Sequence, residues 1–105
     1  MKKITIAITT LAILGTACTS KKATTGEKST ADVVADLKKN FTDADMSEGK
    51  LLWQSNCNKC HKLYNSDDYS VSKWENILPR MIKRAKLDNT QASKVRAYLL
   101  TNAKL

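Results

Sequence analysis

The strongest constraint on this chain is how few of its residues can form a hydrophobic core. The part with enough apolar side chains to fold begins near Asp43 and runs to Leu105, which leaves roughly 60 residues for a domain. Domains of that size usually need disulfides, a metal or a cofactor to hold them together. With 105 residues in all, the chain is also too short for a large multidomain enzyme.

The N-terminal residues have the layout of a secretory signal peptide. Lys2 and Lys3 precede an uncharged stretch from Ile4 to Ala17 that is rich in Ile, Leu, Ala and Thr. This stretch is shorter than the roughly 20 residues that a helix needs to cross a bilayer. We therefore expect residues 1–17 to be removed as a signal peptide and the protein to be exported.

The residues around Cys18 resemble the bacterial lipobox, in which small residues precede a cysteine that is diacylated and becomes the mature N-terminus. Leu14-Gly15-Thr16-Ala17 precedes Cys18, although the motif prefers Leu where Gly15 stands. The resemblance implies a periplasmic protein whose Cys18 carries a lipid anchor, and the non-acidic Thr19 favours the outer membrane. The small residues also suit ordinary signal peptidase, which leaves the alternative of a secreted free thiol.

Two short segments connect this N-terminus to the domain. Residues 18–31 contain no large apolar side chain, so we expect a flexible, lipid-anchored tether. Residues 32–42 carry apolar side chains at helical spacing, namely Val33, Val34, Leu37 and Phe41. This spacing predicts a short connecting helix that packs on the domain or on a partner. The domain itself is predicted to span residues 43–105.

The segment Cys57-Asn58-Lys59-Cys60-His61 offers what such a small domain needs. In a Cys-x-x-Cys-His motif the two sulfurs bond to the vinyl groups of a c-type haem, and the imidazole becomes an iron ligand. Cys57 and Cys60 are three residues apart, so they lie on one face of a helical turn with His61 directly after them. We predict one covalent haem c, attached at both cysteines and ligated by His61.

Two other kinds of site can use the same three residues. A Cys-x-x-Cys pair can be a redox dithiol, and His61 would add a third ligand for zinc. A thioredoxin-like site needs a βαβ framework, which this short domain without strand-like segments does not offer. A structural zinc site needs a fourth ligand, and no other His or Cys lies in residues 43–105. Export also favours haem, because haem is attached to such motifs outside the cytoplasm.

Two helices are predicted at the ends of the domain. The first leads into the motif, with Asp45 and Glu48 as its capping box. The residues that share one face of it are Gly49, Leu52, Trp53 and Asn56. The last helix is predicted from Asp88 to about Leu100, with Asp88 and Gln91 as its capping box. Its inward side chains are expected to be Ala92, Val95, Tyr98 and Leu99.

A middle helix is predicted from the spacing of its apolar residues. Ser72 and Glu75 form its expected capping box. Apolar residues repeat at intervals of three and four, at Trp74, Ile77, Leu78, Met81, Ile82 and Ala85. Pro79 removes one backbone hydrogen bond, so we expect a kink or a break just before Met81. A break there would free Met81 to turn inward as a ligand.

The stretch from Gly49 to Leu100 resembles the cytochrome c family, in which Gly, an aliphatic and an aromatic residue precede the haem cysteines. In that family the glycine lets the last helix cross closely beside an aromatic residue, for which Tyr98 is the counterpart here. The stretch from Trp74 to Met81 is similar to that of short cytochrome c domains with an axial methionine. The resemblance implies an all-α, small cytochrome c fold with helices packed around one covalently bound haem, which Trp74 and Met81 would contact.

Met81 is the predicted second iron ligand. A thioether is the usual partner of His in electron-carrying cytochromes c, because it favours reduced iron and raises the potential. Met46 begins the first helix, about 16 Å along its axis from the attachment site, and the chain has no second histidine. The alternative is that Met81 is a core residue, which leaves five-coordinate iron or a lysine ligand. Many family members orient His through the carbonyl of a following proline, which is missing here, so the partner of His61 stays unassigned.

The formal charge of +8 indicates anionic partners. The basic residues near Met81 are Arg80, Lys83, Arg84 and Lys86. They would steer a redox partner protein with an acidic docking surface, or they form an ordinary solvated helix face. Nucleic acid is disfavoured because the protein is exported.

Together these features predict an electron-transfer protein and not an enzyme. A monohaem cytochrome of this kind passes single electrons between redox partners, binds no small-molecule substrate, and meets the membrane only through its N-terminal lipid. Two alternatives stay open. One is a gas-binding or sensory haem protein with an open sixth site, and the other is a haem subunit of a larger oxidoreductase, docked through residues 32–41.

Overall fold

The fold of this chain was analysed in a computed structural model that describes residues 28–105. This part contains four α-helices and no named strand, which confirms the all-α prediction. The helices are α1 (Thr30–Asn40), α2 (Asp43–Cys57), α3 (Val71–Ala85) and α4 (Asn89–Thr101), with a short 3-10 turn, η1 (Ser66–Asp68). The predicted signal peptide, the predicted lipidation site Cys18 and most of the predicted tether lie outside the described residues.

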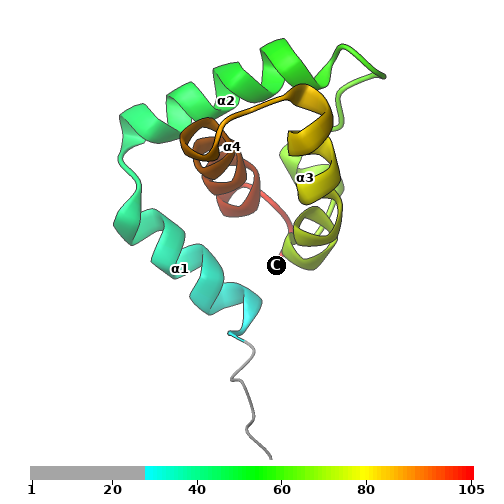
Figure 1. The fold of residues 1–105 in the computed structure, drawn as a ribbon. Helices are drawn as coiled ribbons and strands as arrows, with labels where there is room; N and C mark the ends of the chain where they lie inside the picture. The colour runs from blue at the N-terminus through cyan, green and yellow to red at the C-terminus, as the bar shows by residue number, and fades with distance from the viewer. Residues whose placement is uncertain (1–27) are drawn as a thin grey trace, which may run out of the picture.

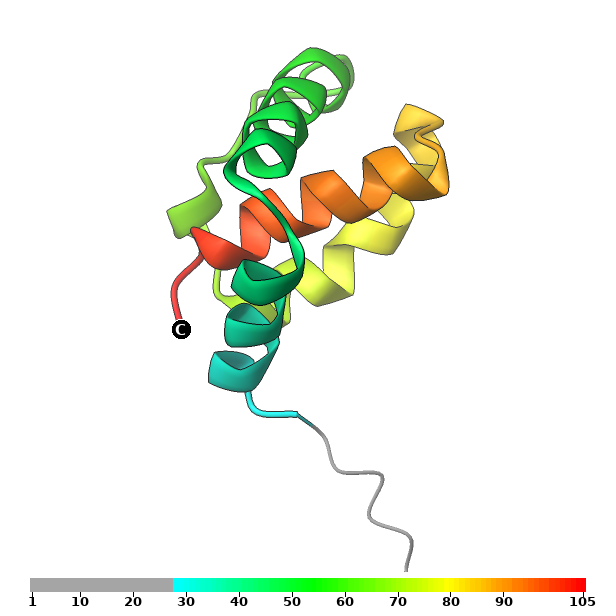
Figure 2. The ribbon, with the colours of Figure 1, turned by 90° about the vertical axis from the view of Figure 1, so that its left-hand side faces the viewer.

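Helix α4 lies at the centre of the arrangement, and the other three helices pack around it (Figures 1 and 2). Val95 and Leu99 point inward as predicted and are fully buried. Ala97 and Leu100 are equally buried, although the helical pattern did not single them out. Because α4 contacts α1, α2 and α3, more than one of its faces is covered.

The contact between α2 and α4 is the most extensive in the fold. Gly49 of α2 lies directly against the α4 backbone, so a Cβ atom at this position would collide with the carbonyl oxygen of Lys94. The same Cβ would lie 3.2 Å from the Cβ of Tyr98. The rings of Trp53 and Tyr98 pack beside this point with centroids 5.7 Å apart. The close crossing at Gly49 beside Tyr98, expected from the family resemblance, is therefore confirmed.

The predicted start of α2 is wrong, because the capping box is formed by Thr42 and Asp45 and not by Asp45 and Glu48. Thr42 caps the helix: its hydroxyl accepts from the Asp45 N–H at 3.2 Å, and the Asp45 carboxylate accepts from the Thr42 N–H at 3.0 Å. These hydrogen bonds, with help from Lys94, hold the pKa of Asp45 below its usual value. Glu48 is not a capping residue, because its carboxylate instead accepts from Lys94 of α4 at 2.6 Å.

The predicted start and break of α3 are also wrong. Ser70 caps α3 by accepting from the Lys73 N–H at 3.2 Å, and Val71 is buried, whereas Ser72 is exposed. Glu75 pairs with Arg96 of α4 instead of taking part in a capping box. Helix α3 runs from Val71 to Ala85 without interruption, so the predicted break just before Met81 is wrong; Pro79 itself is exposed.

The last helix and the connecting helix agree better with their predictions. In α4 the Gln91 N–H donates to the Asp88 carboxylate at 2.8 Å, and the Asp88 N–H donates back to the Gln91 side chain at 3.2 Å. Helix α1 begins two residues earlier than predicted, after the cap Ser29. Its buried residues Val34 and Leu37 lie on the face that packs against α4. Residues 30–40 thus form part of the domain core.

We expect the substitution Gly49→Ala to lower the free energy of unfolding by about 1–3 kcal/mol, because the new methyl group forces α2 and α4 apart. Helix propensity alone would have the opposite effect, since Ala is favoured over Gly by about 1 kcal/mol in a helix interior. The matched control is Ser55→Ala on the exposed face of α2, which should not destabilise the protein. Denaturant unfolding measures both, and a stabilised Gly49→Ala variant would contradict the close crossing.

Candidate functional site

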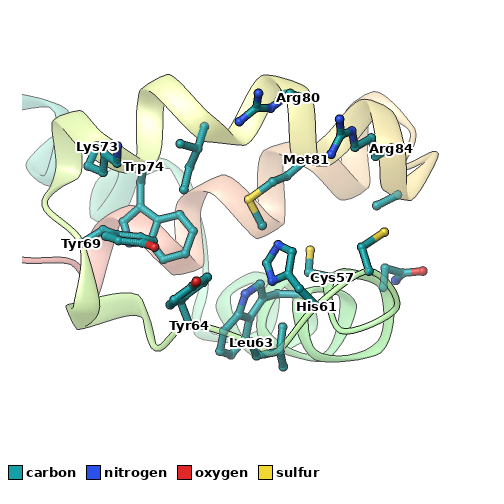
Figure 3. A pocket seen from close by; sticks show the side chains of 15 residues that line it. Cys57, His61, Leu63, Tyr64, Tyr69, Lys73, Trp74, Arg80, Met81 and Arg84 are labelled. Carbon is teal, nitrogen blue, oxygen red and sulfur yellow. The ribbon is translucent and has the colours of Figure 1, made fainter.

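The C-terminal end of α2, the loop that follows it and the inner face of α3 enclose a cavity (Figure 3). Its empty volume is about 960 Å³, including the part that opens to solvent. All of the residues predicted to contact a haem in this part of the chain line it, namely Cys57, Cys60, His61, Trp74 and Met81. Residues up to 24 positions apart in the sequence thus meet at one site.

Two free thiols lie at one end of the cavity. Helix α2 ends at Cys57, and residues 58–60 continue as a turn that carries Cys60. The Cys57 side chain is buried and Cys60 is exposed. Burial raises the pKa of the Cys57 thiol, and the nearby Cys60 adds to this shift. The protonated thiol is therefore the form of Cys57 that the folded chain favours.

His61 follows the thiols, and its ring has a hydrogen-bond partner. The Nδ1 atom lies 2.7 Å from the carbonyl oxygen of Lys62. With the proton on Nδ1 the ring donates this hydrogen bond and leaves the lone pair of Nε2 free to bind a metal. The partner that the sequence left unassigned is thus the carbonyl of the next residue, in the absence of a proline.

Met81 lies opposite this histidine. Its side chain extends from α3 across the cavity toward the His61 ring (Figure 3). Met46, the rejected candidate, is far from the site in the fold: its sulfur accepts a hydrogen bond from the Thr101 hydroxyl at 3.7 Å, at the other end of α2. The structure therefore brings together the two predicted ligands and leaves Met46 out.

Tryptophan and tyrosine side chains form part of the cavity wall. Trp74 is fully buried, and its indole N–H donates to the carbonyl oxygen of Ser66 at 2.7 Å, which fastens the loop to α3. Tyr69 packs edge-on against Trp74 with ring centroids 5.2 Å apart, and Tyr64 packs against Tyr69 at the same distance. Neither tyrosine was predicted from the sequence to lie at the site, because the loop has no helical or strand periodicity. Two tyrosines in a polar segment were the only signal.

Trp53 has a buried indole nitrogen without a hydrogen-bond partner among the described residues. Such an unsatisfied group costs about 1–3 kcal/mol. Because Trp53 lines the cavity, an acceptor on a bound group is one way to satisfy it.

Basic side chains border the cavity. Lys73, Arg80 and Arg84 line it, and no acidic side chain does. Of the predicted basic cluster, Arg80 and Arg84 are thus at the site, whereas Lys83 and Lys86 are exposed and do not line it.

These residues fit a covalent haem. Two thiols three positions apart are followed at once by an imidazole with a free Nε2, a thioether faces that imidazole, and apolar and aromatic side chains line the cavity together with basic ones. Within residues 28–105, no three His, Cys, Asp or Glu side chains are grouped so that they alone could hold a metal ion. None of the helices in this part of the chain is both long and apolar enough to span a membrane.

Comparison with known proteins adds no relative: no protein-family model matches the chain, and neither a curated protein nor a solved structure shows significant similarity to it.

We expect Trp74→Phe to loosen the loop between α2 and α3. Phenylalanine keeps most of the buried ring but removes the N–H that the Ser66 carbonyl accepts, at a cost of about 0.5–1.5 kcal/mol. Amide hydrogen exchange should become faster in residues 62–70. The matched control is Trp53→Phe, whose N–H has no partner among the described residues and whose loss should leave exchange in the loop unchanged. Equal exchange in both variants would contradict the role of this hydrogen bond.

Proposed function

We propose that this protein is a monohaem c-type cytochrome that carries single electrons between redox partners. The observation that carries the proposal is the pairing of His61 with Met81 across one cavity that also holds both cysteines of the attachment motif. A bound haem c would supply the reversible one-electron chemistry of its iron. The chain itself would supply the attachment points, the two iron ligands and the surroundings of the ring.

The two thiols would fix the ring in place. Each S–H would add across one vinyl double bond, with sulfur on one carbon and the hydrogen on the other, so the attachment would need no oxidant. Cys57 would fasten the ring to the end of α2, and Cys60 to the following turn. Since α2 is held against α4 at Gly49, the attachment edge is fixed relative to the core.

The two ligands would set the electron affinity of the site. The carbonyl of Lys62 holds the His61 ring with Nε2 free, which orients the imidazole and raises its basicity. The Met81 thioether favours reduced iron and raises the potential. With His61 and Met81 already placed at one cavity, they would hold the iron in both oxidation states, and little would have to move on electron transfer.

The surroundings suit a carrier rather than an enzyme. Trp74 is fully buried in the cavity wall, and such a packed apolar side chain limits the access of water to a group bound there. Arg80 and Arg84 at the cavity border would attract an acidic surface on a partner protein and speed a brief encounter. Export and a lipid on Cys18 would keep the carrier in the periplasm, on the outer membrane.

Helix α1 bears on the alternative of a larger complex. A docking helix would keep its apolar face free for another subunit, whereas Val34 and Leu37 pack on α4 of the same chain. This use of α1 favours a self-contained carrier.

Carbon monoxide tests the sixth ligand, because it binds reduced haem iron only where a coordination position is free or easily freed. We expect the visible spectrum of the reduced wild-type protein, matured with haem, to be unchanged by the gas. The Met81→Ala variant should respond to it at once. The matched control is Met46→Ala, which removes a methionine that does not line the cavity and should stay unresponsive. An immediate response of the wild type would overturn methionine ligation and favour a gas-binding protein.

A further inference from the structure

The cavity has two chemically different ends, which α3 spans. Lys73 lies near the start of α3 and Arg84 near its end, so the two are about 16 Å apart along the helix axis. Cys57 lies toward the Arg84 end, whereas Tyr64, Tyr69 and Lys73 lie at the other end (Figure 3). Met81 and His61 lie between these ends. One end therefore offers sulfur, and the other offers hydroxyl groups and an ammonium group.

Attachment of a haem at Cys57 and Cys60 would bring part of the haem to the far end of the cavity, which holds Tyr64, Tyr69 and Lys73. In haem the two vinyl groups and the two propionates lie on opposite edges of the porphyrin. If the vinyl edge is fixed to Cys57 and Cys60, the ring must extend past His61 and Met81, and its carboxylates must reach the end that holds the tyrosines. Met81 is eight positions beyond Lys73, or about 12 Å along the helix axis, which leaves room for half of the ring and a propionate arm.

The groups at the far end can bind carboxylates. Tyr64 and Tyr69 each carry a hydroxyl that can donate a hydrogen bond, and Lys73 carries a positive charge. Removal from water raises the pKa of Tyr69, and the neighbouring Tyr64 adds to the shift, so the hydroxyl keeps its proton and remains a donor. The nearest carboxylate in the loop, Asp68, already accepts from the Asn65 N–H at 2.6 Å.

The far end is also held in position before any ligand arrives. Tyr64, Tyr69 and Trp74 form a continuous series of ring contacts, each with centroids 5.2 Å apart. The backbone of Tyr69 is fixed as well, because its carbonyl accepts from the N–H of Lys104 near the C-terminus at 3.2 Å. Pre-positioned donors bind more tightly than mobile ones, since less side-chain freedom is lost on binding.

We propose that Lys73, Tyr64 and Tyr69 form a carboxylate-binding subsite that holds the haem propionates. This inference rests on the proposed function, since it requires the covalent haem. It adds a role for these residues in setting the reduction potential. Propionate charges favour ferric iron, and the Lys73 ammonium and the tyrosine hydroxyls offset those charges. The subsite therefore raises the potential, in the same direction as the Met81 thioether.

The test uses the full chain matured with haem and compares the substitutions Lys73→Met and Tyr69→Phe with the parent protein. We expect both variants to keep the haem and to show a lower reduction potential in spectroelectrochemical titration. The carboxylate bands of their infrared difference spectra, reduced minus oxidised, should shift. The matched control is Lys38→Met, which removes one positive charge from the exposed face of α1 and should change neither readout.

The outcomes separate this inference from the function on which it rests. A lower potential together with shifted carboxylate bands, absent in Lys38→Met, supports the subsite. If both variants carry haem but match the parent in potential and in carboxylate bands, the subsite is refuted while the cytochrome proposal stands. If the parent itself carries no covalent haem, both proposals fail.

Discussion

The close crossing of α2 and α4 at Gly49 is the contact on which the rest of this small structure depends. With no side chain at Gly49, the α2 backbone can lie against the carbonyl of Lys94, and Trp53 can pack on Tyr98 beside it. This contact fixes the direction of α2 and hence the position in space of its last residue, Cys57. A domain with so few core residues gains much of its apolar burial from this single crossing.

The cavity exists because α3 packs mainly on α4 and contacts α2 less. A space therefore remains between α3 and the C-terminal end of α2. Its walls come from both helices and from the loop between them, which Trp74 fastens through the Ser66 carbonyl. A folded chain that leaves apolar and aromatic side chains open to a cavity beside its only histidine and two free thiols gives up burial that a bound group would restore. The proposed haem completes the core as well as supplying the chemistry, which agrees with the shortage of core residues seen in the sequence.

Much of this arrangement could be predicted from the sequence, and the errors have physical causes. Apolar spacing predicted α1, α3 and α4, and the resemblance to the cytochrome c family predicted α2. The spacing of the motif predicted the grouping of Cys57, Cys60 and His61. The N-terminal caps of α2 and α3 were predicted at the wrong residues because several Ser, Thr and Asp residues stand close together there. In α3 the burial of Val71 favours Ser70 over Ser72 as the cap. Pro79 was expected to kink or break α3, and the helix is not broken there, because the loss of one backbone hydrogen bond is not enough to end a helix whose residues pack in the core on both sides of the proline. Tyr64 and Tyr69 were missed because loop positions carry no periodic signal.

Covalent attachment at Cys57 and Cys60 can be measured by whether the mature protein keeps its haem after denaturation. The full chain would be produced with haem maturation, unfolded in acid, separated by chromatography and weighed by mass spectrometry. We expect a chain that carries the mass of one haem and its visible spectrum. The double variant Cys57→Ser, Cys60→Ser should carry neither. A mature chain without haem, or one whose haem dissociates on unfolding, would contradict covalent attachment and with it the proposed c-type cytochrome.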